Sequence, residues 1–141
     1  MRILGLDPGE KRIGVAVSDP LGITAQGLEV ISYTDISEAL KLIAEICRCY
    51  DVTTIVVGNP LKMSGVKGSA SEKAELFAAE LREKLVLPVV MIDERLTSSS
   101  VEKTLVAGGV RRKKRREVKD KLAAVLILEQ YLAYNQRNNK K

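Results

Sequence analysis

The sequence predicts an α/β fold, a five-stranded mixed sheet flanked by helices. Two observations predict it. Three short strand-like segments joined by tight turns open the chain, and after residue 34 helical and strand-like segments alternate. A three-strand antiparallel meander followed by parallel strands with intervening helices forms a mixed sheet with helices on its faces. With 141 residues the chain is expected to be a single domain, residues 1–141, whose C-terminal tail from about residue 135 is frayed.

The meander is expected to use residues 3–7, 12–18 and 23–32. The first segment is apolar up to Asp7, and the turn Asp7-Pro8-Gly9-Glu10 follows it. Pro presets a backbone dihedral in such a turn and Gly permits positive φ. In the second segment Ile and Val alternate with Gly, Ala and Ser. That alternation is typical of a strand with one face of small residues.

A helix and a buried strand come next. Asp35 and Glu38 form a capping pair, and apolar residues recur from there at helical spacing as far as Cys47. The β-branched run at 53–57 indicates a buried strand. The glycine-containing stretch 61–68 is expected to be a loop.

The second helix is expected to open with Ser69 and Glu72 as its capping pair and to turn Leu76, Ala79 and Leu85 toward the core. Residues 89–92 then form the fifth strand, because a strand buried on both faces is apolar throughout.

Two further helices complete the chain. Thr97 or Ser99 caps the first of them, and Gly108-Gly109 ends it. After a basic run at 111–116, the last helix is expected from about residue 117 to residue 134.

The composition restricts the chemistry. The chain contains no histidine. This excludes Ser-His-Asp and Cys-His nucleophile systems, a histidine general base and histidine-ligated zinc. Any catalysis must use carboxylates, hydroxyls, lysines or thiols, and carboxylates without imidazole favour hard cations such as Mg²⁺ or Mn²⁺.

Charge is unevenly distributed. Residues 1–100 hold 11 Lys and Arg against 14 Asp and Glu, a net charge of −3, whereas residues 101–141 hold 12 against 4, a net charge of +8. A basic quarter on an acidic body indicates a polyanionic partner, although a solvated, solubilising face would look the same.

The two cysteines predict a reducing, cytoplasmic location. Cys47 and Cys49 are two residues apart, which on a helix separates them by roughly 200°, so they neither share a metal nor pair easily. No apolar run reaches about 18 residues and the N-terminus lacks a signal-peptide layout, so we expect neither a membrane span nor secretion.

Several acidic residues lie at the ends of predicted strands or near the start of the last helix. Asp7 ends the first strand, Asp93 and Glu94 end the fifth, and Asp120 lies early in the last helix, on the stripe that continues with Ala123. Ligands of open α/β sheets bind beyond the carboxyl ends of strands, and converging carboxylates favour a divalent cation because it removes their repulsion. The structural alternatives are a turn cap for Asp7, a strand-end cap for Asp93, and an ion pair with Arg116 or Lys121 for Asp120.

Four motifs resemble a known family. Asp7-Pro8-Gly9 followed by Lys11-Arg12-Ile13-Gly14-Val15-Ala16 resembles the first-strand signature of the RNase H-like superfamily. More narrowly, the chain resembles the YqgF/RuvX family, the pre-16S rRNA nucleases also described as Holliday junction resolvase-like. The segments at 57–61, 93–98 and 120–124 match it too, in the same order over nearly the whole chain. Asp-x-Gly alone is a weak signal, whereas Asp-Glu-Arg-Leu-Thr with a downstream Asp-x-x-Ala-Ala is specific.

The resemblance implies an RNase H-like fold and a metal-dependent nuclease site. Its catalytic metal ligands would be Asp7, Glu94 and Asp120, with Asp93 as the alternative to Glu94. In the family's fold one strand separates the first and fifth, so a ligand from the fifth must span roughly 10 Å, which favours the longer glutamate. The metal would be Mg²⁺ or Mn²⁺.

Basic residues are expected to contact phosphates. Lys11, Arg12 and Arg95 have a structural alternative, which is pairing with Glu10, Asp19 or Asp93. The loop before residue 68 could close over the substrate. The expected nucleic-acid contacts are Lys11, Arg12, Lys62, Arg95, Arg111, Arg112, Lys113, Lys114, Arg115 and Arg116.

The leading functional hypothesis, taken from the resemblance, is 5′-end processing of pre-16S rRNA. Few aromatic residues are present, which favours recognition of shape in structured RNA or branched DNA over base stacking. The alternatives are a Holliday junction resolvase and a nucleic-acid-binding module without catalysis. A resolvase requires a dimer, and the sequence leaves monomer and homodimer both open.

Overall fold

The computed structural model describes residues 1–9, 11–60, 68–93 and 112–139, and within the last range the side chains of residues 119–135. Its centre is a five-stranded sheet of order β3-β2-β1-β4-β5. The strands are β1 (Arg2–Pro8), β2 (Arg12–Ser18), β3 (Ala25–Ser32), β4 (Val52–Asn59) and β5 (Val89–Asp93). Strands β1, β2 and β3 pair antiparallel, whereas β4 and β5 continue parallel to β1. The expected mixed sheet is confirmed.

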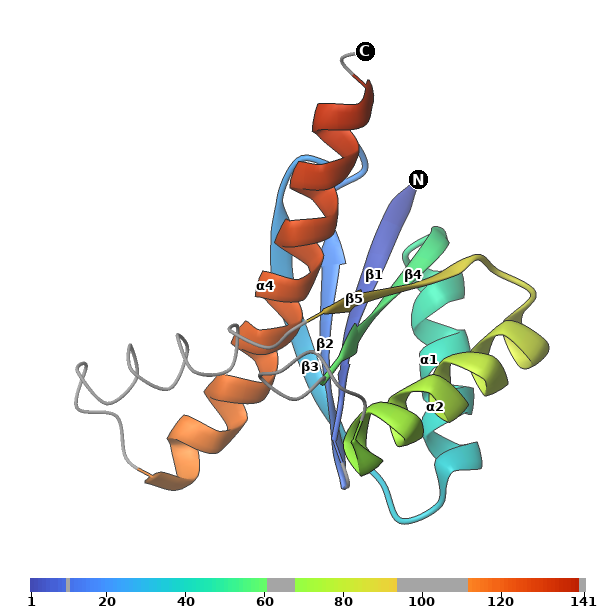
Figure 1. Ribbon diagram of the computed structural model, residues 1–141, viewed down its shortest axis with the longest axis vertical. Coiled ribbons are helices and arrows are strands. Elements are labelled where there is room, and N and C mark those ends of the chain that lie inside the picture. The colour runs from blue at the N-terminus through green and yellow to red at the C-terminus, as the bar shows by residue number, and fades with distance from the viewer. Residues whose placement is uncertain (10, 61–67, 94–111, 140–141) are drawn as a thin grey trace.

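Helices cover both faces of the sheet. Helices α1 (Ile36–Cys49) and α2 (Ser69–Leu85) lie together on one face, and the long α4 (Arg112–Asn139) crosses the other (Figure 1). The helix expected between residues 97 and 109 lies outside the described residues.

The sheet separates two hydrophobic clusters. One lies under α1 and α2 and includes Leu6, Val15 and Val57. The other lies under α4 and includes Ala16, Val56 and Leu128. Because neighbouring strand residues point to opposite faces, this division identifies the face to which each strand residue belongs.

The expected start of α1 is confirmed. Asp35 is the N-cap, and its carboxylate accepts a hydrogen bond of 3.0 Å from the Ser37 amide. The expected cap of α2 is wrong, since the helix begins at Ser69 itself and its N-cap is Gly68, which makes no side-chain capping bond. The glycine instead supplies its carbonyl to the Glu72 amide.

The predicted apolar side of α2 is confirmed for Leu85, which packs against the core, and is wrong for Leu76 and Ala79. Leu76 is two-thirds exposed and Ala79 is exposed, while the adjacent Phe77 and Ala78 are buried. Phe77 and Leu76 compete for the core because neighbouring helix residues point roughly 100° apart. The larger aromatic ring takes the buried place.

Helix α4 is longer at both ends than expected. It begins at Arg112, so all but the first residue of the basic run is helical, and it continues to Asn139 through most of the tail expected to fray. Among the described residues, no helix is both long and apolar enough to cross a membrane.

Candidate metal and nucleic-acid site

Asp7 lies on the face of the sheet that α4 covers. It is the last residue but one of β1 and pairs with Gly14 of β2. A side chain at Gly5, two residues before Asp7, would contact Leu128 and Ala124 of α4, which places residues 3, 5 and 7 of β1 on that face. The Asp7 carboxylate is therefore directed toward α4 and is partly buried.

Gly14 brings α4 close to Asp7. A Cβ atom there would lie 2.7 Å from the carbonyl carbon of Asp120 and nearer still to its oxygen, a separation that real Cβ atoms essentially never show. Only glycine allows the helix backbone to rest directly on the strand at this point. Since Gly14 is the cross-strand partner of Asp7, the close approach brings Asp120 over the strand pair that carries Asp7.

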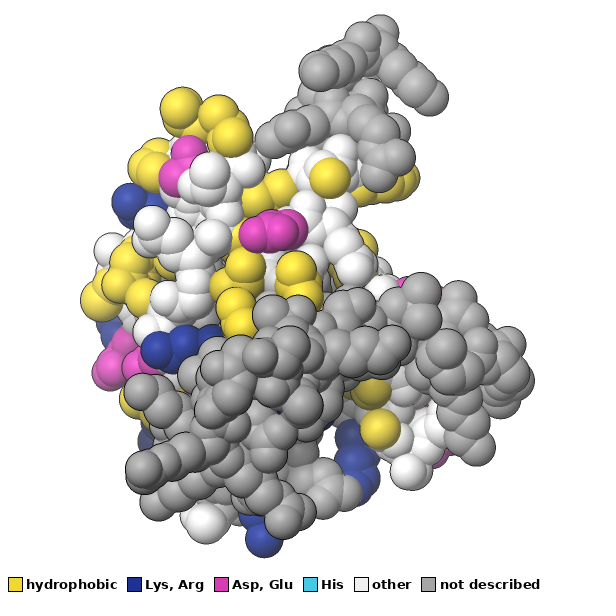
Figure 2. All heavy atoms as spheres, turned by 90° about the vertical axis from the view of Figure 1, so that its left-hand side faces the viewer, with side chains coloured by type: hydrophobic (Ala, Val, Ile, Leu, Met, Phe, Trp, Pro, Cys, Tyr) yellow, Lys and Arg dark blue, Asp and Glu magenta, His cyan; other side chains and the backbone are white. Residues whose placement is uncertain are grey.

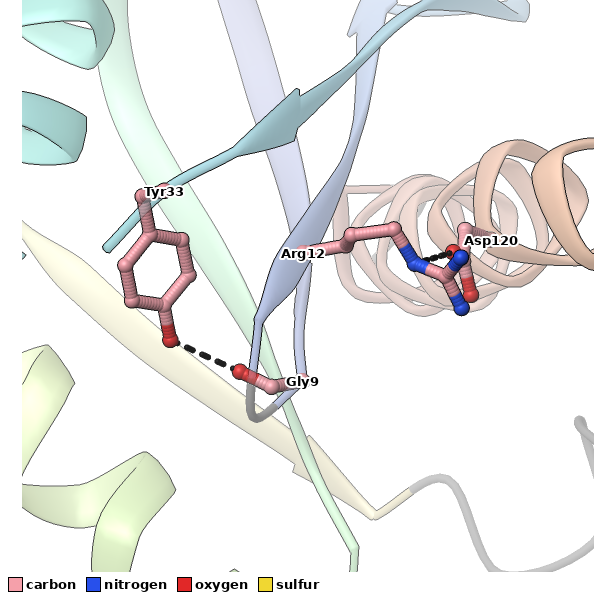
Figure 3. Close-up of polar contacts among 4 residues, drawn as sticks. All are labelled: Gly9, Arg12, Tyr33 and Asp120. Atoms are coloured by element: carbon pink, nitrogen blue, oxygen red, sulfur yellow. Dashed lines mark hydrogen bonds and ion pairs between the residues drawn. The ribbon is translucent and has the colours of Figure 1, made fainter.

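Asp120 forms an ion pair with Arg12. The guanidinium Nε of Arg12 lies 3.0 Å from Oδ2 of Asp120, and the two side chains are 33% and 21% exposed. Figure 3 shows Arg12 extending from β2 to the helix. The three partners considered for Arg12 from the sequence did not include Asp120. Asp19, one of those three, instead accepts hydrogen bonds from the amides of its own turn, the shortest of them 2.7 Å from Ile23.

The sequence contained a signal for this pair. Arg12 belongs to the strand face that carries Gly14 and Ala16, and a face of small residues is where a helix can approach most closely. The signal indicates the face without indicating which helix residue lies opposite Arg12.

Asp93 belongs to the other face. Ile92, which precedes it, packs in the cluster under α4, so alternation directs Asp93 toward α2. The β4 residue paired with Asp93 is Asn59, and its amide oxygen accepts a hydrogen bond from Ser71 of α2. The Asp93 side chain is thus on the opposite face from those of Asp7 and Asp120.

The described residues hold only part of the expected ligand set. Glu94 lies outside them, and within them no group of three acidic or sulfur-bearing side chains is placed to hold a metal. Asp7 and Asp120 therefore form the observed part of the candidate site.

A groove of about 670 Å³ opens beside the Arg12–Asp120 pair. Lys11, Ser32, Tyr33 and Glu38 also line it. Tyr33, which was not selected from the sequence, also lines the groove. Its hydroxyl donates a 2.8 Å hydrogen bond to the Gly9 carbonyl and so braces the β1–β2 turn, on the opposite side of that turn from Arg12 (Figure 3).

The other basic residues are only partly located. Lys62, Arg95 and Arg111 lie outside the described residues, and the run Arg112–Arg116 is helical in its backbone while its side chains are not described. Figure 2 shows described basic side chains at the left edge and at the bottom of this face, and hydrophobic side chains mainly in its upper half. The lower half is the end at which β1 finishes and the β1–β2 turn lies (Figure 1).

Residues 1–134 match the family described as "RuvX: Holliday junction resolvase". The chain belongs to the RuvX family. It is 54% identical over 134 residues to a Geobacillus kaustophilus protein named "Putative pre-16S rRNA nuclease", covering 94% of this chain and 97% of that protein. A Halalkalibacterium halodurans protein of the same name is 51% identical over 134 residues, covering 94% and 96%.

Solved structures that superpose on this chain confirm the fold. Thermus thermophilus RuvC in complex with a Holliday junction substrate has a TM-score of 0.62 at 15% identity, covering 96% of each chain. The fowlpox virus resolvase in complex with Holliday junction DNA has a TM-score of 0.58 at 12% identity, covering 95% of this chain and 98% of that one. The expected family, the RNase H-like fold and the nuclease class are confirmed.

Proposed function

We propose that this RuvX-family chain is a metal-dependent phosphodiesterase that processes the 5′ end of pre-16S rRNA, and that Asp7, Glu94 and Asp120 hold Mg²⁺ or Mn²⁺. The observation that carries the proposal is the shared face of Asp7 and Asp120, brought together by the close contact at Gly14. The names of relatives about half identical to this chain support the substrate.

The residues fit a divalent cation. Oδ2 of Asp120 is buried, and the group 3.0 Å from it is a cation, the Arg12 guanidinium. The structure thus already requires positive charge at this carboxylate, since a buried carboxylate without a cation costs several kcal/mol. The proposed donors are all carboxylate oxygens, which hard cations such as Mg²⁺ and Mn²⁺ prefer.

Strand alternation supports the proposed third ligand. Ile92 faces α4 and Asp93 does not, so an extended chain would return to the α4 face at residue 94. This supports Glu94 over Asp93 as the ligand that completes the set with Asp7 and Asp120.

Each part of the chain has a proposed task. A bound divalent cation activates water and stabilises the leaving oxygen in phosphodiester hydrolysis. Asp7 and Asp120 hold the site rigidly, because one lies in a central strand and the other on a helix packed against it. Lys11 and Arg12, which line the groove, would meet the phosphates of the substrate. The other basic residues named from the sequence would contact its backbone as well: Lys62, Arg95, Arg111 and the run Arg112–Arg116.

The test is cleavage of a pre-16S rRNA fragment by the purified chain, with the new 5′ ends mapped. We expect Asp7→Asn and Asp120→Asn to lower the rate by about 100-fold or more and EDTA to abolish cleavage. Asp93→Asn is the matched control, because it makes the same change on the opposite face of the sheet. Cleavage that persists in EDTA, or that Asp7→Asn leaves unchanged, would contradict the proposal.

Holliday junction resolution is the second candidate, because the matching family is described by that activity. The same site would then cut two strands symmetrically, which requires a homodimer rather than a monomer. A four-way DNA junction assayed beside the rRNA fragment, with sedimentation to give the oligomeric state, separates the two. Binding of either substrate with cleavage of neither would instead indicate a nucleic-acid-binding module.

We also propose that one domain carries the whole activity and that it works in the cytoplasm. The family match over residues 1–134 supports the first statement. An rRNA precursor as substrate, named for bacterial relatives, supports the second.

A further inference from the structure

Arg12 lies between the candidate metal site and the open groove. Its side chain leaves the first residue of β2, lines the groove, and ends with Nε against the buried Oδ2 of Asp120. One third of its side chain is exposed, so the guanidinium lies at the boundary between the protein and the solvent in the groove.

The ion pair and a metal use the same carboxylate. Asp120 needs a cation near Oδ2, and Arg12 supplies it in the structure. A divalent cation at Asp120 would place a second positive charge within a few ångströms of the guanidinium. The two cations repel one another and compete for the same oxygen lone pairs.

The groove offers Arg12 another position. The groove has a volume of about 670 Å³, and Arg12 already lines it, so rotation about its side-chain bonds would move the guanidinium from Asp120 toward the groove. Among the described residues, Lys11 and Glu38 are the charged side chains that line it besides Arg12 and Asp120. A phosphate entering there would meet a planar guanidinium fork, which matches phosphate oxygens with two parallel hydrogen bonds.

We propose that Arg12 is an exchangeable counter-ion of Asp120. Without a divalent cation it neutralises the carboxylate, and when a cation takes Asp120 the guanidinium turns into the groove and binds a phosphate of the nucleic acid. The inference rests on the proposed function, because it takes Asp120 to be a metal ligand. It adds that metal binding and phosphate binding strengthen one another through this single side chain, and coupling of this kind is reciprocal.

The first test is Mn²⁺ affinity without nucleic acid, measured on the full chain from the electron paramagnetic resonance signal of free Mn²⁺. We expect Arg12→Gln to bind Mn²⁺ about fivefold more tightly than the wild type. The guanidinium that competes with the metal for Asp120 has been removed, and a partly exposed ion pair contributes about this much in free energy. Lys11→Gln is the matched control. It removes the same charge from the same groove, so it measures the effect of charge alone.

Arg12→Lys provides a second test in case the glutamine variant misfolds. It keeps the charge but lacks the Nε that contacts Asp120, so its Mn²⁺ affinity should fall between those of the wild type and Arg12→Gln. Arg12→Gln affinity equal to that of Lys11→Gln would overturn the exchange, because charge alone would explain it. Affinity weaker than that of the wild type would overturn it as well, and would show that Arg12 holds Asp120 in place for the metal.

The second test is binding of a non-cleaved RNA duplex with Ca²⁺ present or absent. In the wild type, Ca²⁺ should strengthen binding about fivefold more than it does in Arg12→Gln. Equal strengthening in both proteins would overturn the coupling. Asp120→Asn distinguishes failure of the proposed function. If this variant binds Mn²⁺ as tightly as the wild type does, Asp120 is not a metal ligand, and the proposed function fails independently of the role of Arg12.

Discussion

Replacing Gly14 by alanine tests whether the contact between α4 and β2 positions the candidate site. The new Cβ would lie 2.7 Å from the carbonyl carbon of Asp120, whereas ordinary contact begins at 3.4 Å. The obstacle is helix backbone, which cannot rotate aside, so α4 must move outward by roughly 1 Å. Overpacking of this kind costs about 1–3 kcal/mol of unfolding free energy.

The same displacement reaches the site, because Asp120 is the residue that must move. A misplacement of about 1 Å in a catalytic group can cost about 100-fold in rate. We therefore expect Gly14→Ala to lower both the free energy of unfolding, measured in urea by circular dichroism, and the Mn²⁺ affinity. The loss of affinity should exceed what unfolding of the protein explains.

Two other glycines under α4 provide matched controls. The nearest atoms to a Cβ at Gly27 belong to the side chains of Lys121 and Val125, and the closest is 3.4 Å away, which is ordinary van der Waals contact. A Cβ at Gly5 would lie 2.9 Å from the Leu128 Cβ. The destabilisation should follow the order Gly14, then Gly5, then Gly27, with Gly27→Ala within about 0.5 kcal/mol of the wild type. If Gly14→Ala is as stable as Gly27→Ala, the close approach does not set the position of α4.

Three further predictions concern the rest of the chain. The backbone hydrogen bond from Thr24 lowers the pKa of Asp19 below 3.8, so this carboxylate stabilises the fold above that pH and its contribution disappears as the pH falls through the lowered pKa. The difference in unfolding free energy between the wild type and Asp19→Asn, measured in urea from pH 6 to pH 2, should therefore shrink as the pH falls. A constant difference would contradict this linkage. Burial raises the pKa of the Cys47 thiol to about 11, while Cys49 is exposed. A thiol reagent at pH 8 should therefore modify one cysteine quickly, and Cys49→Ser should remove that fast phase. Two cysteines modified quickly in the wild type would refute the burial argument. Tyr33→Phe removes the 2.8 Å hydrogen bond to the β1–β2 turn and should cost about 0.5–1.5 kcal/mol in urea unfolding, with Tyr134→Phe, an exposed tyrosine of α4, as the silent control.

Much of the fold was predictable because its signals are local. The alternation in β2 predicted a strand from residue 12 to residue 18, and the structure has those bounds. Asp35 was recognised as a helix start because a capping carboxylate acts on an amide two residues away. The phase of α2 was not predictable in this way, because Leu76 and Phe77 are both apolar and only the space under the helix decides between them.

The candidate site, too, was predictable from the sequence only in part. The sequence by itself restricted any catalysis to carboxylates, hydroxyls, lysines or thiols, since histidine is absent, and its ordered motifs named Asp7 and Asp120 as candidates. Only the tertiary structure decided that Asp120 contacts Arg12 and that Asp93 belongs to the other face. An ion pair forms only where the two charged groups come into contact, so the partner of Arg12 depends on which helix residue lies over the strand. That choice is made by the packing of α4 on Gly14 and Gly5, far from Asp120 along the chain.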